Sequence, residues 1–287
     1  MSRAAMSHMP RVLGVIVAGI TVCLSLLVPL SHPTGAASPA TQVRIGLFGD
    51  SLAVQAEPYF NLLVDATGAA KVTDFTYGGT AACDWLPDMR RFARSARPQA
   101  VLLEFIGNTF SPCMLGCAAG SQTSVRRYCS AVSTAIQVFL SVGTHVFLIG
   151  TPITRTQWLD HDPDWDALNQ AFAALAAEHP DHVTFVDAGR AVEGPHHSFV
   201  SALRCMAFEP CTGPREGKVG TDIVRSPDGV HFCPVEVAFG AGLVSRCPVY
   251  SSGAFRFAAA MAAPLMREFP ILQTRAWGGP ARYGAPP

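Results

Sequence analysis

The stretch "VRIGLFGDSLAVQAEPYF", residues 43–60, contains the transition on which the fold depends. Its first half is a short apolar run that ends at Gly-Asp, which is typical of a buried strand. Ser51 follows at once, before a run with helical character. A serine at this point fits a turn that caps a helix, because Asp and Ser are favoured there. It also fits a nucleophile carried on the tip of a rigid strand.

Strands and helices continue to alternate along the chain after this transition. The predicted strands are almost continuously apolar, which implies that they are buried on both faces. This pattern predicts an α/β fold, a three-layer α/β/α sandwich with a mainly parallel central sheet. Pro58 is expected in the first turn of its helix, where the missing N–H costs little. Strands are predicted at 42–48, 71–77, 99–107, 144–150 and 182–188, and helices at 58–68, 87–96, 124–143, 164–180 and 253–269.

Three polar or flexible residues follow directly after predicted strands. Ser51, Gly79 and Asn108 each come just past the carboxyl end of a strand. In parallel α/β sheets, ligands bind at that edge. This placement favours a functional role for Ser51 over a simple turn.

The N-terminus has the composition of an export signal. Arg3 and Arg11 precede an uncharged run, 12–30, and small residues suited to cleavage follow near 36–40. We expect a secretory signal peptide over 1–36, although the run is barely long enough to be an uncleaved membrane anchor instead. The domain proper is expected over 42–269, and a disordered tail over 270–287. The predicted location is secreted or in the cell envelope.

Charge and cysteine content fit an exported protein. Without residues 1–36, the chain has 19 basic and 21 acidic side chains and no basic run, so nucleic acid is not an expected partner. Eight cysteines remain, and an even number in an exported chain predicts four disulfides, with Cys205–Cys211 and Cys233–Cys247 as local pairs. No second close pair of ligands accompanies "CMLGC", so no metal site is predicted. Residues 190–253, rich in Gly, Pro and Cys, are expected to form a disulfide-held excursion.

A serine nucleophile needs a base, a group that orients the base, and donors for the developing oxyanion. "SPDGVHFCP" places Asp228 three residues before His231. On one turn, that carboxylate can reach the imidazole N–H, which fixes the tautomer and stabilises the imidazolium. "FIGNTF" supplies Asn108, whose side-chain amide can donate to an oxyanion.

Together, these blocks resemble the GDSL, or SGNH, hydrolase family. The matching blocks are "FGDSLA" at 48–53, "IGNTF" at 106–110 and "DGVH" at 228–231, and the resemblance spans roughly 42–269. It implies an SGNH, flavodoxin-like fold with no cofactor. It also implies a catalytic triad of Ser51, His231 and Asp228. The oxyanion donors would include Asn108 and the N–H of Ser51.

The chain departs from the family pattern in two places. Thr109 stands where the third block usually has an acid. The second block, "TYGGTAACDW", allows two registers, which place the backbone oxyanion donor at Gly79 or at Ala82, and the register with Gly79 is preferred because it keeps the family's glycine. A disulfide between Cys83 and the 113/117 pair would join the second and third blocks.

The resemblance implies a secreted serine ester hydrolase, a lipase or esterase that works through an acyl-enzyme. An esterase or transferase acting on O-acyl groups of carbohydrates or cell-wall glycans is the alternative. The presence of all four site residues argues against a non-catalytic cell-wall binding domain. The expected partner is a small-molecule or glycan ester. We expect a monomer, and association with a membrane or cell wall stays open.

Overall fold

The computed structural model describes residues 42–273, apart from 119, 208, 212–219 and 237–245. The predicted signal segment and most of the predicted tail lie outside the described residues. Five strands form one sheet in the order β2-β1-β3-β4-β5, and every neighbouring pair is parallel. The strands are β1 (Val43–Gly49), β2 (Ala70–Thr76), β3 (Ala100–Glu104), β4 (His145–Ile149) and β5 (Val183–Val186).

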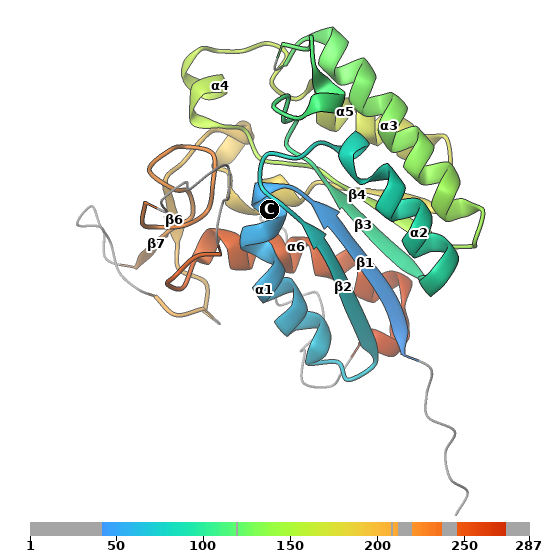
Figure 1. The fold of residues 1–287 in the computed structure, drawn as a ribbon. Coiled ribbons are helices and arrows are strands. Elements are labelled where there is room, and N and C mark those ends of the chain that lie inside the picture. The colour runs from blue at the N-terminus through green and yellow to red at the C-terminus, as the bar shows by residue number, and fades with distance from the viewer. Residues whose placement is uncertain (1–41, 119, 208, 212–219, 237–245, 274–287) are drawn as a thin grey trace, which may run out of the picture. The chain divides into compact units, whose positions relative to one another are not determined.

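Helices cover both faces of this sheet, as Figure 1 shows. One face carries α1 (Ser51–Asp65) and α6 (Ser252–Glu268), and the other carries α2 (Leu86–Ala96), α3 (Gln122–Leu140) and α5 (Ala167–Ala177). The short helix α4 (Arg155–Leu159) lies in the connection after β4. The predicted three-layer α/β/α sandwich is therefore confirmed. None of the helices within the described residues is long and apolar enough to span a membrane.

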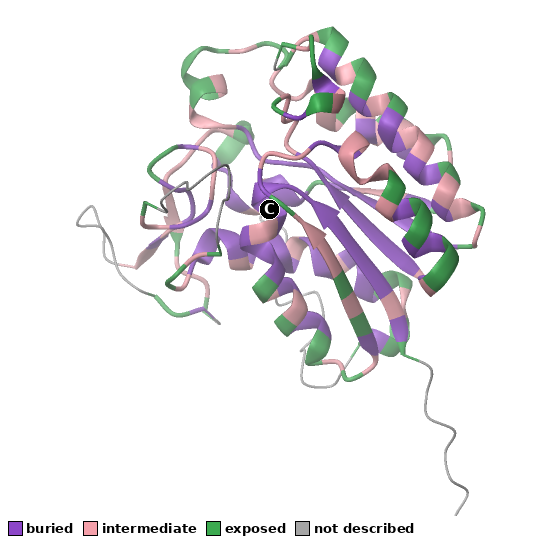
Figure 2. Ribbon diagram, in the orientation of Figure 1, coloured by how far each residue is buried: buried purple, intermediate pink, exposed green. Residues whose placement is uncertain are grey.

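Alternation along the strands explains why both faces need a cover. Ile45 and Leu47 pack into the core with α1 and α6, whereas Phe48 packs into the core with α2 and α3. All three side chains are fully buried. Figure 2 shows the central strands as buried along their length. A strand buried on both faces reads as a continuous apolar run, which is what the sequence displays.

Several predicted boundaries differ from the structure by a few residues, such as the strand predicted at 99–107, which ends at Glu104, and two differences matter more. The first helix begins at Ser51, so Pro58 lies in its interior and not in its first turn. Asp50 caps this helix through its side chain, and buried residues of α1 pack against α6, which together outweigh the cost of one proline. At the other end, residues 270–272 form a 3-10 turn with Leu272 buried, so the ordered chain extends past 269.

The cysteines form three disulfides in the described residues, and the prediction of four is wrong. Both predicted local pairs are confirmed, and Cys83–Cys113 joins the loops after β2 and β3. Cys117 and Cys129 are free thiols. Both local pairs lie in the predicted excursion, which contains a two-stranded antiparallel ladder of β6 (Ala202–Arg204) and β7 (Thr221–Ile223).

Candidate active site

Ser51 is the first residue of α1, and only Asp50 separates it from Gly49, the last residue of β1. Its neighbour Asp50 takes the capping role, because Asp50 Oδ1 accepts the backbone N–H of Leu52 at 3.2 Å. The N–H groups at the start of a helix have no partner within the helix and carry its positive dipole end. Ser51 is therefore not needed as a cap, and it lies where negative charge is stabilised.

Asp228 and His231 form the hydrogen-bonded pair that their spacing predicts. His231 Nδ1 lies 2.7 Å from Asp228 Oδ2, and Oδ1 accepts the N–H groups of Val230 and His231 at 2.8 and 3.0 Å. Partial burial raises the pKa of Asp228, but these hydrogen bonds outweigh burial and hold it below its ordinary value. Asp228 is thus a carboxylate at neutral pH, and it fixes the orientation of the imidazole.

The loop that carries His231 lies against α1, one turn after Ser51. The N–H of Phe232 donates to Oε1 of Gln55 at 2.7 Å, and Gln55 is buried one turn after Ser51. His231 is also near enough to Asp50 for its charge to act on that carboxyl. The fold therefore brings together two segments 180 residues apart in the sequence, as the nucleophile and base of one site require.

Arg225, which the sequence reading did not single out, holds this loop in shape. It is almost completely buried, and its guanidinium donates to the carbonyl oxygens of Ile153, Gly229 and Val230. Burial lowers the pKa of Arg225 to about 10, so it stays charged at neutral pH. Arg225 joins the loop after β4 to the Asp228–His231 loop.

The close approach of the same loop to Arg155 requires a glycine at position 229. Its φ is +79°, and a Cβ there would lie 2.4 Å from the Cβ of Arg155. The N–H of Arg155 donates to the carbonyl oxygen of Gly229 at 2.9 Å, which explains this close approach.

Asn108 reaches the site from the end of β3. Its Nδ2 donates to Asp50 Oδ2 at 2.9 Å and more weakly to the carbonyl oxygen of Thr80 at 3.3 Å. The hydroxyl of Tyr128 donates to the carbonyl oxygen of Asn108 at 2.8 Å. The amide orientation is therefore fixed by Asp50, and the longer bond to Thr80 is the one that an incoming oxygen can replace.

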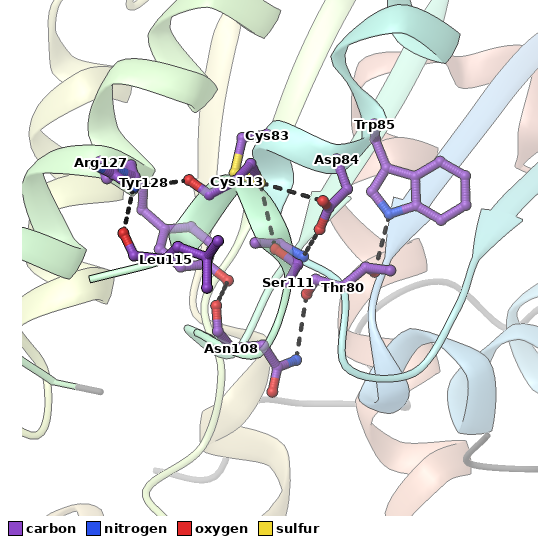
Figure 3. Close-up of a disulfide and its surroundings, with 11 residues drawn as sticks. Thr80, Cys83, Asp84, Trp85, Asn108, Ser111, Cys113, Leu115, Arg127 and Tyr128 are labelled. Carbon is purple, nitrogen blue, oxygen red and sulfur yellow. Dashed lines mark hydrogen bonds between the residues drawn. A yellow bond between two sulfur atoms is a disulfide. The ribbon is translucent and has the colours of Figure 1, made fainter. Parts of the chain in front are cut away.

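The second block lies beside Asn108, and Figure 3 shows how the disulfide Cys83–Cys113 ties the two loops together. Gly79 lies in a turn with φ +77° and open space around it. Ala82 is fully buried and is the first residue of the 3-10 helix Ala82–Trp85. Both candidate donors thus belong to the loop that meets Asn108 through Thr80.

A cavity of about 120 Å³ opens next to this region, between the loops that follow β3 and β4. Its lining combines apolar and polar side chains, and Asn169 is held in place by bonds to the backbone of Thr151. The residues around it include Ile106, Gly107, Thr151, Gln157, Trp165 and Asn169. Because Ile106 and Gly107 directly precede Asn108 in the chain, this cavity is a candidate for substrate binding.

Within the described part of the chain, no group of potential metal ligands includes Ser51, Asp228 or His231. Among the described residues, one group, Cys205, Cys211 and Asp222, brings three potential ligand atoms together. The two cysteines form a disulfide, so they present no thiolates to an ion.

A scan against models of protein families and a search of curated proteins find no match for this chain. Solved structures do match. A candidate acylhydrolase from Bacteroides fragilis is 14% identical with a TM-score of 0.52, over 83% of this chain and 93% of that protein. A lipase/acylhydrolase from Enterococcus faecalis is 16% identical with a TM-score of 0.50, over 78% of this chain and 96% of that protein. The described part of the chain therefore has the fold of the GDSL/SGNH hydrolases.

Proposed function

We propose that this chain is a serine ester hydrolase with Ser51 as nucleophile, His231 as general base and Asp228 as the residue that orients it. One observation carries the proposal: the Asp228–His231 pair lies on a loop hydrogen-bonded to Gln55, one turn after Ser51 in the helix that Ser51 begins. The shared fold supports it, because one of the two solved proteins is a lipase/acylhydrolase and the other a candidate acylhydrolase.

In the proposed reaction, Ser51 Oγ attacks the ester carbonyl while His231 Nε2 takes the hydroxyl proton. The tetrahedral intermediate collapses, the C–O bond to the alcohol breaks, and the alcohol leaves with the proton from His231. Water then attacks the acyl-enzyme, His231 again takes and returns a proton, and the carboxylic acid is released from Ser51.

The developing oxyanion would accept hydrogen bonds from three donors: the side-chain amide of Asn108, the N–H of Ser51 and a backbone N–H of the second block. Between the two registers, Ala82 is the better donor. As the first residue of a 3-10 helix, its N–H has no carbonyl partner within that helix. Gly79 lies three residues before this helix, in the preceding turn, so its N–H is not one of the free N–H groups at the start of the helix.

We further propose that the enzyme works outside the cytoplasm on a small-molecule or glycan ester. Three disulfides support this location, because such bonds persist in oxidising compartments. Transfer of the acyl group to a carbohydrate hydroxyl in place of water would require a bound acceptor, for which the cavity between the loops after β3 and β4 is the candidate position.

A fluorophosphonate probe tests the proposal directly, because it reacts with activated serines and not with surface hydroxyls. Peptide mapping should find the label on Ser51, and Ser51→Ala should take no label while it keeps the wild-type circular dichroism and melting temperature. Hydrolysis of p-nitrophenyl acetate should fall by about 10⁴-fold or more in the same variant. Labelling of another serine, or a rate in Ser51→Ala within about ten-fold of wild type, would rule the assignment out. A folded wild type that neither takes the label nor hydrolyses the ester would favour a binding domain.

A further inference from the structure

Two carboxyl groups are buried together at the start of α1. Asp50 and Glu104 are both fully inaccessible to solvent. Glu104 ends β3 and lies opposite Gly49 in the sheet. A Cβ on Gly49 would lie 2.4 Å from the Cβ of Ala53 and 2.9 Å from the carbonyl oxygen of Glu104. The absence of a side chain at 49 thus lets β3 and α1 meet closely beside the residue that precedes Ser51.

The hydrogen bonds treat the two carboxyls unequally. Asp50 accepts three N–H donors, from Leu52, Ile106 and Asn108, and uses both of its oxygens. Glu104 accepts the N–H of Ala53 at 3.0 Å through Oε2, and the backbone N–H of Asp50 also acts on this carboxyl. Its Oε1 is buried and accepts no hydrogen bond from any residue that the structure describes. Buried polar atoms normally find a partner, so this carboxyl group calls for an explanation.

We propose that Glu104 keeps its proton at neutral pH and donates it to the Asp50 carboxylate, so that the pair carries one negative charge and Asp50 holds Asn108 in place. Glu104 is then a positioning residue, which acts on the site through Asp50. The inference rests on the proposed function only in taking Asn108 as an oxyanion donor.

The electrostatics of the pair agree with this division. Burial raises the pKa of Asp50 to about 6, and a hydrogen bond between the two carboxyl side chains acts against the rise. Burial raises the pKa of Glu104 well above its ordinary value, and the charge of Asp50 raises it further. Two carboxyls this close do not both ionise easily, so Asp50 ionises first and Glu104 keeps the shared proton.

Two other titratable groups face the pair from neighbouring elements. His231 acts on Asp50 from the loop after β7, and its positive form favours the Asp50 carboxylate. Tyr128 faces both carboxyls from α3. Burial, followed by the negative charge of Asp50, raises the pKa of Tyr128, so its hydroxyl stays protonated and can donate to Asn108.

Glu104→Gln is the decisive variant, because glutamine has the shape of the protonated acid. Its amide N–H can replace the carboxyl O–H toward Asp50, and its oxygen can accept the N–H of Ala53. Glu104→Leu is the matched control, since it removes both interactions at similar volume. We expect Glu104→Gln to keep kcat within about three-fold of wild type, and Glu104→Leu to lose up to about 10²-fold in kcat with little change in KM. In Glu104→Leu alone, the Asp50 carboxylate loses the O–H that donates to it, so Asp50 should take up a proton at higher pH. The fall of kcat/KM on the acid side should therefore move to higher pH in this variant.

Infrared spectroscopy tests the proton without any use of catalysis. At neutral pH, the difference spectrum between wild type and Glu104→Gln should contain the C=O stretch of an un-ionised carboxylic acid. Carboxylate bands in its place would overturn the proposal, even if Glu104→Leu failed to fold. So would equal losses of kcat in the two variants, or no loss in either. A failure of the wild type to hydrolyse esters would instead contradict the proposed function and leave the infrared result as it stands.

Discussion

Asn108 shows how much a four-residue motif depends on residues outside it. Its side-chain amide points where it does because Asp50, 58 positions earlier in the chain, accepts its N–H. Asp50 also accepts the N–H of Ile106, so one carboxylate fixes both the side chain and the turn that carries it. The missing acid at Thr109 therefore does not leave Asn108 unsupported.

Asn108→Ala should lower kcat by about 10²–10³-fold with little effect on KM, because an oxyanion donor contributes mainly in the transition state. Steady-state kinetics with p-nitrophenyl acetate measure both constants. Thr109→Ala serves as the control and should change kcat much less. Asn108→Asp should be at least as harmful as Asn108→Ala, since it places a carboxylate against Asp50. A rise in KM at unchanged kcat would move Asn108 from the oxyanion site to substrate binding.

At the scale of elements, the strands and most helices could be predicted, because each is a continuous apolar run or an amphipathic repeat bounded by glycine. The start of α1 could not, because Pro58 suggested a helix beginning there, whereas the cap at Asp50 begins it at Ser51. Glu104 and Arg225 were also missed. In a sequence, a single charge at a strand end or in a loop looks solvated, and only packing shows that it is buried.

Asp74 lies at the contact between α1 and β2, and its pKa should differ between the folded and the unfolded chain. Asn61 Nδ2 donates to Asp74 Oδ2 at 2.8 Å, while Asn61 Oδ1 and Asp74 Oδ1 are buried with no hydrogen-bond partner among the described residues. Burial raises the pKa of Asp74 to about 6, and the charge of Glu57 adds to the rise. The stabilising effect of this carboxyl is therefore full below about pH 3.9 and is lost as the pH rises through 6.

Asp74→Asn should raise the free energy of unfolding at pH 8 by about 1 kcal/mol and change it little at pH 4. The amide carries no charge to desolvate, and its N–H can supply a donor for Asn61 Oδ1. Urea unfolding at the two pH values measures the difference. Asp181→Asn, at an exposed position, is the control and should behave alike at both. A destabilised Asp74→Asn at pH 8 would show that the charge itself is needed.

For the molecule as a whole, the sequence is a better guide to which residues come together than to the interactions that hold them in place. Ser51, Asn108, Asp228 and His231 could be proposed because each ends a strand or belongs to a recognisable block. The cysteine pattern was less informative, since an even count does not require every cysteine to pair. Cys117 precedes α3 and Cys129 lies on it, and neither forms a disulfide.

Two of the disulfides should differ in what their loss does to the protein. Cys83–Cys113 closes 30 residues and ties the second-block loop to the loop of Asn108, whereas Cys205–Cys211 closes only 6 residues of the excursion. Loop-closure entropy predicts a loss of about 3–4 kcal/mol for the first pair and about 2 kcal/mol for the second when both cysteines become alanine.

Only the Cys83→Ala/Cys113→Ala variant should also lower kcat, because it alone frees the loops that present Asn108 and Ala82. Urea unfolding and ester hydrolysis at a temperature where both variants are folded separate the two effects. Alkylation before reduction should modify Cys117 and Cys129 in the wild type, which verifies the pairing on which the comparison depends. Equal losses of kcat in the two double variants would mean that the Cys83–Cys113 bond stabilises the fold without positioning the oxyanion donors.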